Sequence, residues 1–261
     1  MKFSFIGAGN MGSAIIGGMV KNFRPYDILV TDKNKALLKS LYEKYNVMTA
    51  EENTDVLDSD FLFLCVKPNV LFDVIEEIKD KISDKTTVVS IVAGKHLKDI
   101  EEAFCRKIGI IRVMPNTPAL VGEAMSAVCA NEKVDDNKLK VIIDVFSNLG
   151  RAEIIPEKLM DAVTGISGSA PAYVFMMIEA MADAGVEAGM PRDKAYTFAS
   201  QAVLGSAKMV LETKKHPGEL KDMVCSPGGT TIEAVRSLEK TGFRSSIIEA
   251  IRKCVEKSKN I

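Results

Sequence analysis

The chain has 261 residues, of which 47% are hydrophobic and 26% are charged, a balance that is ordinary for a globular enzyme. This length leaves room for two domains, because most domains contain about 100–200 residues. The formal net charge of −1 at pH 7 excludes a strongly basic surface of the kind that binds nucleic acids or anionic membranes.

Five cysteines are scattered through the chain, and no two of them form a Cys-x-x-Cys pair. The odd number predicts reduced thiols rather than a disulfide framework or a zinc site. The first residues lack the order of a secretion signal, and the longest uncharged stretch, residues 162–178, contains Gly165, Gly168 and Pro171 and makes a poor membrane helix. We therefore expect a cytoplasmic protein that binds no metal, membrane or nucleic acid.

Short β-like runs alternate with amphipathic helical stretches over residues 1–155. In the stretch at residues 70–82, for instance, Val70, Val74 and Ile78 recur on one helical face between acids and lysines. Such alternation predicts a Rossmann-type, doubly wound α/β domain, in which helices cover a parallel sheet. The predicted strands are residues 2–6, 27–31, 61–66, 86–92, 109–114, 126–129 and 152–155.

A glycine-rich turn joins the first predicted strand to the helix that follows it. Gly7, Gly9 and Gly12 meet, in order, the need for a tight turn, for a backbone that touches a pyrophosphate, and for an open helix N-terminus whose N–H groups favour negative charge. Asn10 and Met11 complete this predicted cofactor site. The setting after a strand and before a helix favours bound NADH or NADPH over a turn without a ligand.

Two neighbouring charges end the second predicted strand. Asp32 lies 20 residues beyond Gly12, where a carboxylate would accept hydrogen bonds from the adenosine ribose and repel a 2′-phosphate. Lys33 would attract that phosphate instead. The pair leaves the choice between NADH and NADPH open, and a solvated Asp-Lys turn is the alternative interpretation.

Three more loops follow predicted strands at their carboxyl ends, where a doubly wound sheet places its ligands. The loops are small or stiffened by proline, which suits a flat nicotinamide ring. Lys67 and Arg112 either belong to this site or are plain solvated cations. The cofactor residues predicted from these loops are Val66, Lys67, Pro68, Ala93, Gly94, Pro115 and Asn116.

Residues 156–261 have no β pattern and are predicted to form an all-α domain whose helices are interrupted by glycine and proline. Between residues 173 and 188 the only charges are Glu179, Asp183 and Glu187, four residues apart, so the helix is apolar around most of its circumference. Such a helix needs burial. We expect a homodimer through the C-terminal helices; a central helix wrapped by its own chain is the alternative, and a ring of dimers would show the same pattern.

Hydroxyls and glycines gather in the segment Ser226-Pro-Gly-Gly-Thr-Thr231, ahead of a helix predicted at residues 232–238. They make either a compact site for a carboxylate or a simple helix cap. The chain holds only two histidines, His96 and His216, and neither has an evident carboxylate partner in the sequence. Because oxidation of an alcohol normally requires a positioned base and reduction of an imine does not, this scarcity favours imine chemistry, with capping or surface roles for both histidines.

Six segments resemble, in order and spacing, the pyrroline-5-carboxylate reductase family, over residues 3 to about 255. The last two are the most specific, because few other nicotinamide enzymes carry them. The segments are GAGNMG at 7–12, VKP at 66–68, SIVAG at 90–94, MPNTPA at 114–119, TGISGSAPAY at 164–173 and LKDMVCSPGGTT at 220–231.

The resemblance implies hydride transfer from NADH or NADPH to the C=N carbon of 1-pyrroline-5-carboxylate, which gives L-proline in the last step of proline synthesis. It also implies a Rossmann domain joined to a helical domain that interlocks with a second subunit. By the family pattern, Ser226, Gly229 and Thr230 hold the substrate carboxylate. The hydroxyl of Thr231, the implied catalytic group, approaches the imine nitrogen. The residues implied to line the nicotinamide are Ala93, Gly94, Pro115 and Asn116.

Two positions depart from the family pattern. Many members end the second strand with a hydroxyl or amide residue followed by arginine, so Asp32 and Lys33 leave a preference for NADP in doubt. Ala170 stands where glycine is common and adds one methyl group, which would tighten the pocket without abolishing it.

Two other interpretations compete with this one. A β-hydroxyacid or 6-phosphogluconate-type dehydrogenase has a similar glycine turn but requires a lysine soon after a Ser-Gly-Gly type turn, and here no lysine follows residues 167–170 before Lys194. A non-catalytic dinucleotide sensor would keep the glycine turn and lose the substrate segment, whereas residues 226–231 are intact.

Overall fold

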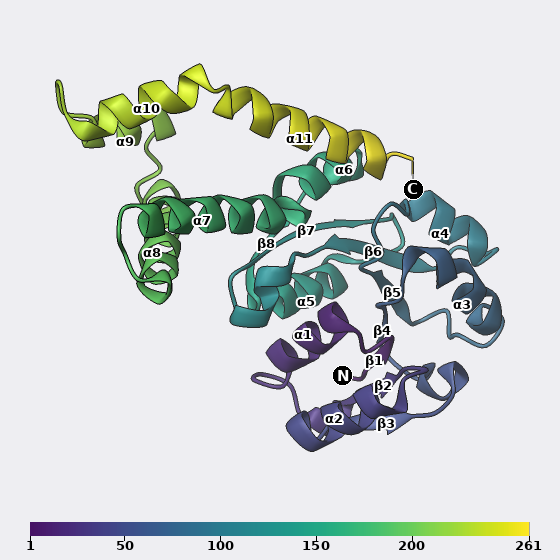
Figure 1. Ribbon diagram of the computed structural model, residues 1–261. Coiled ribbons are helices and arrows are strands. Elements are labelled where there is room, and N and C mark those ends of the chain that lie inside the picture. The colour runs from purple at the N-terminus through teal and green to yellow at the C-terminus, as the bar shows by residue number, and fades with distance from the viewer. Residues whose placement is uncertain (261) are drawn as a thin grey trace. The chain divides into compact units, whose positions relative to one another are not determined.

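The computed structural model describes residues 1–260, which form two compact units. The first consists of residues 1–169 together with residues 254–260, and the second of residues 170–253 (Figure 1). These units are defined by packing. The functional boundary expected between residues 155 and 156 stays a prediction.

The first unit contains an eight-stranded sheet in the order β3-β2-β1-β4-β5-β6-β7-β8. Neighbouring strands run parallel except for β6 and β7, and the sheet confirms the predicted Rossmann-type fold. The strands are β1 (Phe3–Ile6), β2 (Ile28–Thr31), β3 (Met48–Ala50), β4 (Phe61–Leu64), β5 (Thr87–Ser90), β6 (Gly109–Met114), β7 (Ala124–Ala130) and β8 (Gly150–Ile154).

The sheet differs from the expected one at two places. Strand β7 pairs antiparallel with β6, with Met114 opposite Ala127, because only residues 115–123 join the two strands and a parallel crossover needs about a dozen residues or more. Strand β3 was not predicted, since it has three residues that are exposed or half-buried and so shows no hydrophobic signal.

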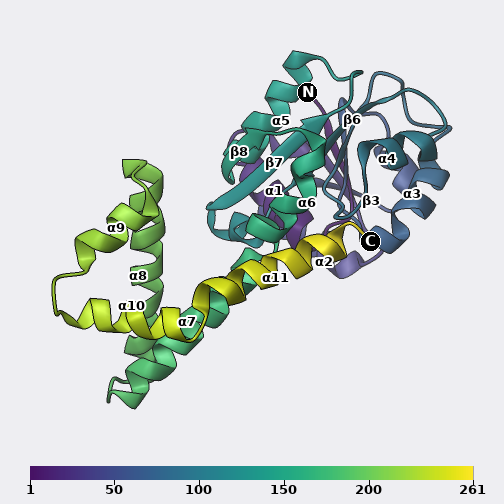
Figure 2. The same cartoon turned by 90° about the horizontal axis from the view of Figure 1, so that it is seen from above.

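Helices cover both faces of the sheet, as Figures 1 and 2 show for α1, α5, α3 and α4. Helices α1 (Asn10–Met19), α2 (Lys35–Tyr45) and α5 (Asp136–Ser147) contribute to one buried apolar cluster. Helices α3 (Leu71–Ile78) and α4 (Leu97–Ala103) contribute to a second, which also includes Met160 of α6 (Met160–Val163). The shorter helical turns are η1 (Pro25–Asp27), η2 (Asn53–Val56), η3 (Pro68–Val70), η4 (Thr117–Val121), η5 (Glu157–Leu159) and the π-helix η6 (Thr164–Gly168).

Aromatic pairs hold the centre of the sheet. Phe5 of β1 and Phe63 of β4 are register partners, and their rings stack with centroids 4.4 Å apart. Phe3 and Phe61, two residues earlier on the same strands, stack at 5.6 Å. Stacked aromatic pairs on adjacent strands add to the free energy gained by burial, so these rings fix the register of the two strands that carry the glycine turn and the loop beside it.

The second unit consists of helices, which confirms the predicted all-α region. They break at residues 188–191, 214–216 and 225–229, as the glycines and prolines predict. The first two of these helices approach each other closely at Gly185, where an added Cβ would lie 3.3 Å from the Cβ of Ala195. The helices are α7 (Ala170–Glu187), α8 (Arg192–Thr213), α9 (Pro217–Val224), α10 (Thr230–Lys240) and α11 (Phe243–Ser258), of which residues 254–258 belong to the first unit.

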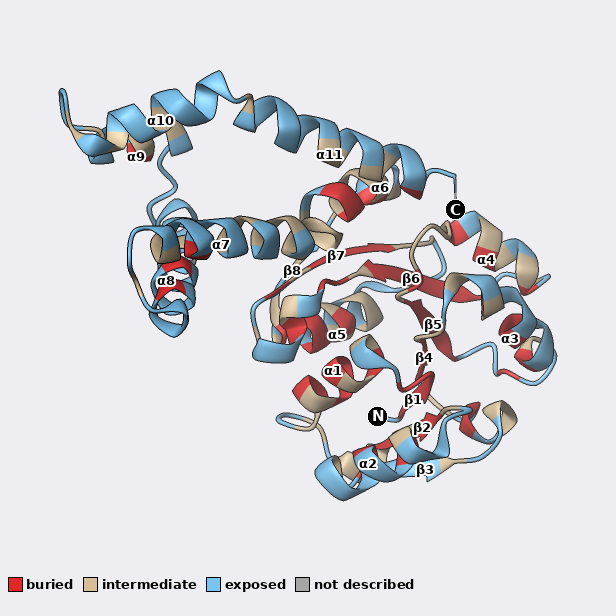
Figure 3. Cartoon of the chain, viewed as in Figure 1, coloured by how far each residue is buried: buried red, intermediate tan, exposed pale blue. Residues whose placement is uncertain are grey.

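Many large apolar side chains of the second unit are exposed. Figure 3 colours most of its helices as exposed. On α7, Phe175 is 63% exposed and Met176 is 69% exposed. An apolar groove of about 890 Å³ runs along α7, α10 and α11 and is lined mainly by Met, Ala, Leu, Ile and Phe side chains. None of the helices in residues 1–260 combines the length and the apolar character needed to cross a membrane.

Candidate active site

The glycine turn has the geometry that its sequence predicts. Gly7 has a φ of +105°, and an added Cβ there would lie 2.5 Å from the carbonyl oxygen of Cys65 on the neighbouring strand. A Cβ on Gly12 would lie 2.5 Å from the carbonyl oxygen of Gly7. Both positions therefore require glycine for the turn itself, and α1 begins at Asn10 directly after it.

Gly9 is different, because an added Cβ would meet nothing within 4 Å. The protein itself does not need glycine there, whereas a ligand that approaches the backbone would. Gly9 is also the N-cap of α1 without a side-chain cap, and its carbonyl accepts the first helical bond, from Ser13, at 2.8 Å. The N–H groups of Asn10, Met11 and Gly12 thus point out of the helix start, which fits the pyrophosphate of a dinucleotide.

Asp32 is tied to the glycine turn. Its Oδ2 accepts a hydrogen bond from the Ala8 N–H at 2.6 Å, and its Oδ1 accepts one from the Asn34 N–H at 2.7 Å. A carboxylate has about four acceptor positions, so two remain for ribose hydroxyls. The half-buried Asp32 is therefore more than part of a solvated turn, while Lys33 is exposed beside it.

The loops after β4 and β5 lie at the same carboxyl edge of the sheet as the glycine turn. Val66 and Pro68 are half-buried and Lys67 is exposed, which leaves its interpretation as a solvated cation open. Ala93 and Gly94 are half-buried, and Gly94 has a φ of +72°, a conformation that favours glycine.

Pro115 and Asn116, which follow β6, are buried, and the Asn116 amide joins two other segments. Its Nδ2 donates to the Ser167 carbonyl at 3.0 Å, and its Oδ1 accepts from the Met125 N–H at 2.9 Å. Ser167 lies in the π-helix η6, and an added Cβ on Gly168 would lie 2.7 Å from the Met114 side chain. The amide of Asn116 is thus engaged in positioning its loop, and π-helical turns are frequent at functional sites.

Arg112 is buried and paired, so its interpretation as a solvated cation is wrong. Its Nη1 donates to Oε1 of Glu157 at 3.1 Å and lies 3.2 Å from Nδ1 of His96. His96 has the predicted capping role, at the start of α4, and the fold also gives it a carboxylate neighbour at 3.7 Å, which the sequence did not reveal. His216 caps α9, where its Nδ1 accepts from the Gly218 N–H at 3.0 Å.

Two cysteines near these loops are protected thiols. Burial raises the pKa of Cys65, which lies beside Gly12, far above its ordinary value of 9.0. Burial, with a smaller contribution from Glu157, raises the pKa of Cys129 to about 12. Because the thiolate is the reactive form, neither thiol is a nucleophile near neutral pH.

The predicted carboxylate site lies at the start of α10, in the second unit. The helix begins at Thr230, two residues earlier than predicted, so Thr230 and Thr231 belong to its first turn and Gly229 is the N-cap. The loop is compact, since the Gly229 N–H donates to the Ser226 carbonyl at 3.1 Å and a Cβ on Gly229 would lie 2.3 Å from the Ser226 hydroxyl. No side chain caps this helix, so its first N–H groups and three hydroxyls are available to an anion.

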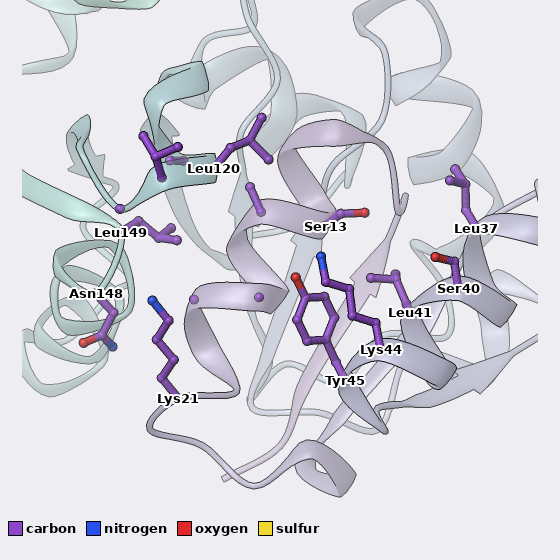
Figure 4. Close-up of a pocket in the computed structure, with 16 residues that line it drawn as sticks. Ser13, Lys21, Leu37, Ser40, Leu41, Lys44, Tyr45, Leu120, Asn148 and Leu149 are labelled. Carbon is purple, nitrogen blue, oxygen red and sulfur yellow. The ribbon is translucent and has the colours of Figure 1, made fainter. Parts of the chain in front are cut away.

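A separate cavity of about 470 Å³ lies between α1, α2, η4 and the end of α5 (Figure 4). Lys44 and Tyr45 extend from α2 toward α1, where a Cβ on Gly17 would lie 2.6 Å from the Tyr45 hydroxyl. The lining contains none of the predicted cofactor residues, so this cavity and the predicted site are distinct.

Comparisons with known proteins cover both parts of the chain. Residues 157–261 match the family model for pyrroline-5-carboxylate reductase dimerisation, and residues 2–94 match the model for NADP oxidoreductase, coenzyme F420-dependent. Among solved structures, a pyrroline carboxylate reductase of Plasmodium falciparum with NADP bound is 32% identical and superposes with a TM-score of 0.91, covering 100% of this chain and 97% of that one.

A 3-hydroxyisobutyrate dehydrogenase of Mycobacterium tuberculosis is 11% identical, with a TM-score of 0.55, and covers 73% of this chain and 66% of that one. This likeness concerns the fold alone. The pyrroline-5-carboxylate reductase of Escherichia coli K12 is 49% identical, and the match covers 100% of this chain and 98% of that protein. On this full-length identity and the matching dimerisation model, the chain belongs to the pyrroline-5-carboxylate reductase family.

Proposed function

We propose that this protein reduces 1-pyrroline-5-carboxylate to L-proline with NADH or NADPH. Family membership over the full length supports the activity. The observation that carries the proposal is the presence in one chain of both a glycine turn open to a ligand and an uncapped, hydroxyl-rich helix start. A dinucleotide sensor would need only the first.

The cofactor supplies a hydride from its reduced nicotinamide when it is bound. The N–H groups of Asn10, Met11 and Gly12 hold the pyrophosphate, and Asp32 accepts hydrogen bonds from the adenosine ribose. The loops after β4, β5 and β6 hold the nicotinamide ring and exclude water from one of its faces. The residues proposed for this part are Gly7, Gly9, Lys33, Val66, Lys67, Pro68, Ala93, Gly94, Pro115 and Asn116.

The start of α10 binds the substrate. Ser226, Gly229 and Thr230 hold the carboxylate at the positive end of the helix dipole. The Thr231 hydroxyl hydrogen-bonds the ring nitrogen and so orients the C=N bond. Hydride addition to the carbon of the protonated imine gives the secondary amine directly, so no side chain has to remove a proton.

We also propose that the protein acts as a homodimer through its C-terminal helices. The dimerisation model that matches residues 157–261 supports oligomerisation. The apolar groove along α7, α10 and α11 and the exposed Phe175 and Met176 supply a surface that gains free energy when a second copy covers it. A ring of such dimers would contain this same interface within each dimer. In functional terms the chain divides into residues 1–155 for the cofactor and 156–261 for substrate and partner.

The activity is tested by mixing the purified protein with 1-pyrroline-5-carboxylate and NADH or NADPH. We expect absorbance at the reduced nicotinamide band to fall and proline to accumulate in equal amount. A 3-hydroxy acid with the oxidised cofactors is the control for dehydrogenase activity. No turnover of the imine with either cofactor, in the presence of a working reductase standard, would sink the proposal.

A further inference from the structure

Glu157 connects three segments of the first unit through a single oxygen. Its Oε1 accepts a hydrogen bond from the Leu97 N–H at 2.6 Å, at the start of α4. The same atom accepts from Nη1 of Arg112 at 3.1 Å, on β6. Glu157 itself begins the turn η5, which leads into α6 and the π-helix.

Both partners lie next to loops that are proposed to hold the nicotinamide. Leu97 stands three residues after Gly94, and Arg112 stands three residues before Pro115. A second link joins the same regions, because the Asn116 amide donates to the Ser167 carbonyl at 3.0 Å. Residues 157–168 are therefore bonded to the segments beside the loops after β5 and β6, and the Glu157 side chain bonds both Leu97 and Arg112.

The charge on Glu157 compensates a buried cation. The Arg112 side chain is 3% exposed, whereas that of Glu157 is 28% exposed. A buried guanidinium without an anionic partner is strongly unfavourable, so loss of the Glu157 carboxylate would leave the charge of Arg112 uncompensated. His96 adds a third contact: its side chain accepts a hydrogen bond from the Asp99 N–H as part of the helix cap, and its Nδ1 lies 3.2 Å from Nη1 of Arg112.

We propose that Glu157 is a positioning residue for hydride transfer, which sets the distance between the Ala93–Gly94 loop and the Pro115–Asn116 loop. This inference rests on the proposed function, since it assigns a purpose to the loops that hold the nicotinamide. Glu157 touches neither cofactor nor substrate in this scheme. It acts through the Leu97 N–H and Arg112, so its loss disturbs the nicotinamide end of the dinucleotide and leaves the glycine turn unchanged.

Two substitutions separate the effect of the negative charge of Glu157 from the effect of the length of its side chain. Glu157→Gln keeps the length and removes the anion. Glu157→Asp keeps a negative charge in the neighbourhood of Arg112 but shortens the side chain by one methylene, which draws the carboxylate back from both the Leu97 N–H and Nη1 of Arg112. Thermal unfolding of each variant checks that the protein remains folded.

The matched control is an ion pair at the other end of the same two strands. Asp84 precedes β5, Arg106 precedes β6, and Nη1 of Arg106 lies 2.5 Å from Oδ1 of Asp84. Asp84→Asn thus also removes a carboxylate that bridges β5 and β6, but at the amino ends, away from the cofactor loops. We expect kcat and cofactor affinity of this variant to match those of the unsubstituted protein.

Three measurements distinguish positioning from a general structural role. ADP-ribose, with or without a 2′-phosphate, reports binding of the adenosine half alone. For Glu157→Gln and Glu157→Asp we expect its affinity to stay within about twofold, as for independent sites. We expect kcat to fall roughly tenfold to a hundredfold, as when reacting groups are misplaced. The deuterium isotope effect on kcat with 4-deuterated reduced cofactor should rise, because hydride transfer becomes slower than release of product.

Equal losses of ADP-ribose affinity and of kcat, or a kcat within about twofold of the unsubstituted protein in both folded variants, would overturn the inference. An equal loss in Asp84→Asn would do the same. Failure of the proposed function is recognised separately, because then the unsubstituted protein does not reduce the imine. In that case the inference is tested by the fluorescence of the reduced nicotinamide, which increases when the cofactor binds. The inference requires that this increase is lost in both Glu157 variants while ADP-ribose still binds to them.

Discussion

The two units of the chain differ in how far they bury their large apolar side chains. In the first, all seven phenylalanine, isoleucine and leucine residues of β1 and β4 are buried, as is Ser4. In the second, few apolar side chains are buried and many large ones are exposed, and Figure 3 colours most of these helices as exposed. The buried ones are Ala182, Ala195, Ala199 and Leu220.

This difference separates a fold that is complete from one that is not. A sheet covered on both faces by its own helices removes its apolar surface from water within one chain. The second unit keeps an open apolar groove along α7, α10 and α11, a surface that the proposed homodimer would cover. The glycine turn thus belongs to a unit whose sheet is covered on both faces, whereas the predicted substrate segment belongs to a unit with exposed apolar surface, which we expect assembly to stabilise.

The largest effect should come from the centre of the sheet. Phe63→Ala removes a fully buried ring stacked on Phe5 and is expected to lower the free energy of unfolding by about 3–5 kcal/mol. Urea unfolding at two protein concentrations measures this loss, which should not depend on concentration. Phe175→Ala in the second unit is the comparison and should shift the midpoint in a concentration-dependent way. Concentration-independent loss in both variants would contradict the contrast between the units.

A charge on the open face of α7 should weaken assembly. Met176→Glu places a carboxylate where a partner subunit would bury it without a cation, so the dissociation constant of the dimer should rise roughly a hundredfold or more. Sedimentation velocity across a dilution series measures this change. Tyr42→Glu, on the exposed face of α2, is the matched control and should leave the oligomer intact. A monomer in the unsubstituted protein at micromolar concentration would refute the dimer.

Thr231→Ala tests the chemistry assigned to the second unit. The loss of one hydroxyl that steadies the reacting nitrogen should lower kcat roughly tenfold, while cofactor affinity stays unchanged. Steady-state kinetics and cofactor titration separate the two quantities. Thr231→Ser retains the hydroxyl and should recover most of the activity. Full activity of Thr231→Ala would remove this residue from the mechanism.

Asp32 tests the chemistry assigned to the first unit. Asp32→Asn keeps an oxygen for the Ala8 N–H and removes the negative charge, so use of NADPH relative to NADH should rise several-fold. Asp32→Ala also frees the Ala8 N–H and should weaken both cofactors. The ratio of kcat/KM values for the two cofactors measures the preference. An unchanged ratio in Asp32→Asn would assign the preference to Lys33 or to other residues.

The smallest effect concerns the buried thiol on β7. Because burial raises the pKa of Cys129 to about 12 from its ordinary 9.0, the unfolded chain ionises before the folded one. Stability contributed by the neutral thiol is complete below pH 9.0 and is lost as the pH rises from 9.0 toward about 12. Between pH 8 and a pH above 9.0, the free energy of unfolding should therefore fall more steeply for the unsubstituted protein than for Cys129→Ala. Parallel pH dependences would contradict this assignment.

Much of the cofactor site could be predicted because its signals are local. The glycine turn lies within six residues, and the structure shows close backbone approaches at Gly7 and Gly12 and an open position at Gly9, while the cofactor contacts stay a prediction. Three breaks between the C-terminal helices were also predicted, since glycine or proline lies in or beside each of them, although Gly185 and Gly205 lie inside α7 and α8 without interrupting them. The short strand β3 and the antiparallel β7 were missed or misassigned, because pairing partners rather than local pattern determine them.

The sequence by itself determined the two-part order of the chain, the cofactor turn and the apolar character of α7, because each depends on residues a few positions apart. Only the tertiary structure determined the environment of Arg112. The sequence allowed it to be either a cation of the site or a solvated cation. Its partners His96 and Glu157 stand 16 and 45 residues away in the chain. Such pairs form only when the sheet brings their strands and loops together, so they cannot be predicted from periodicity or from a motif.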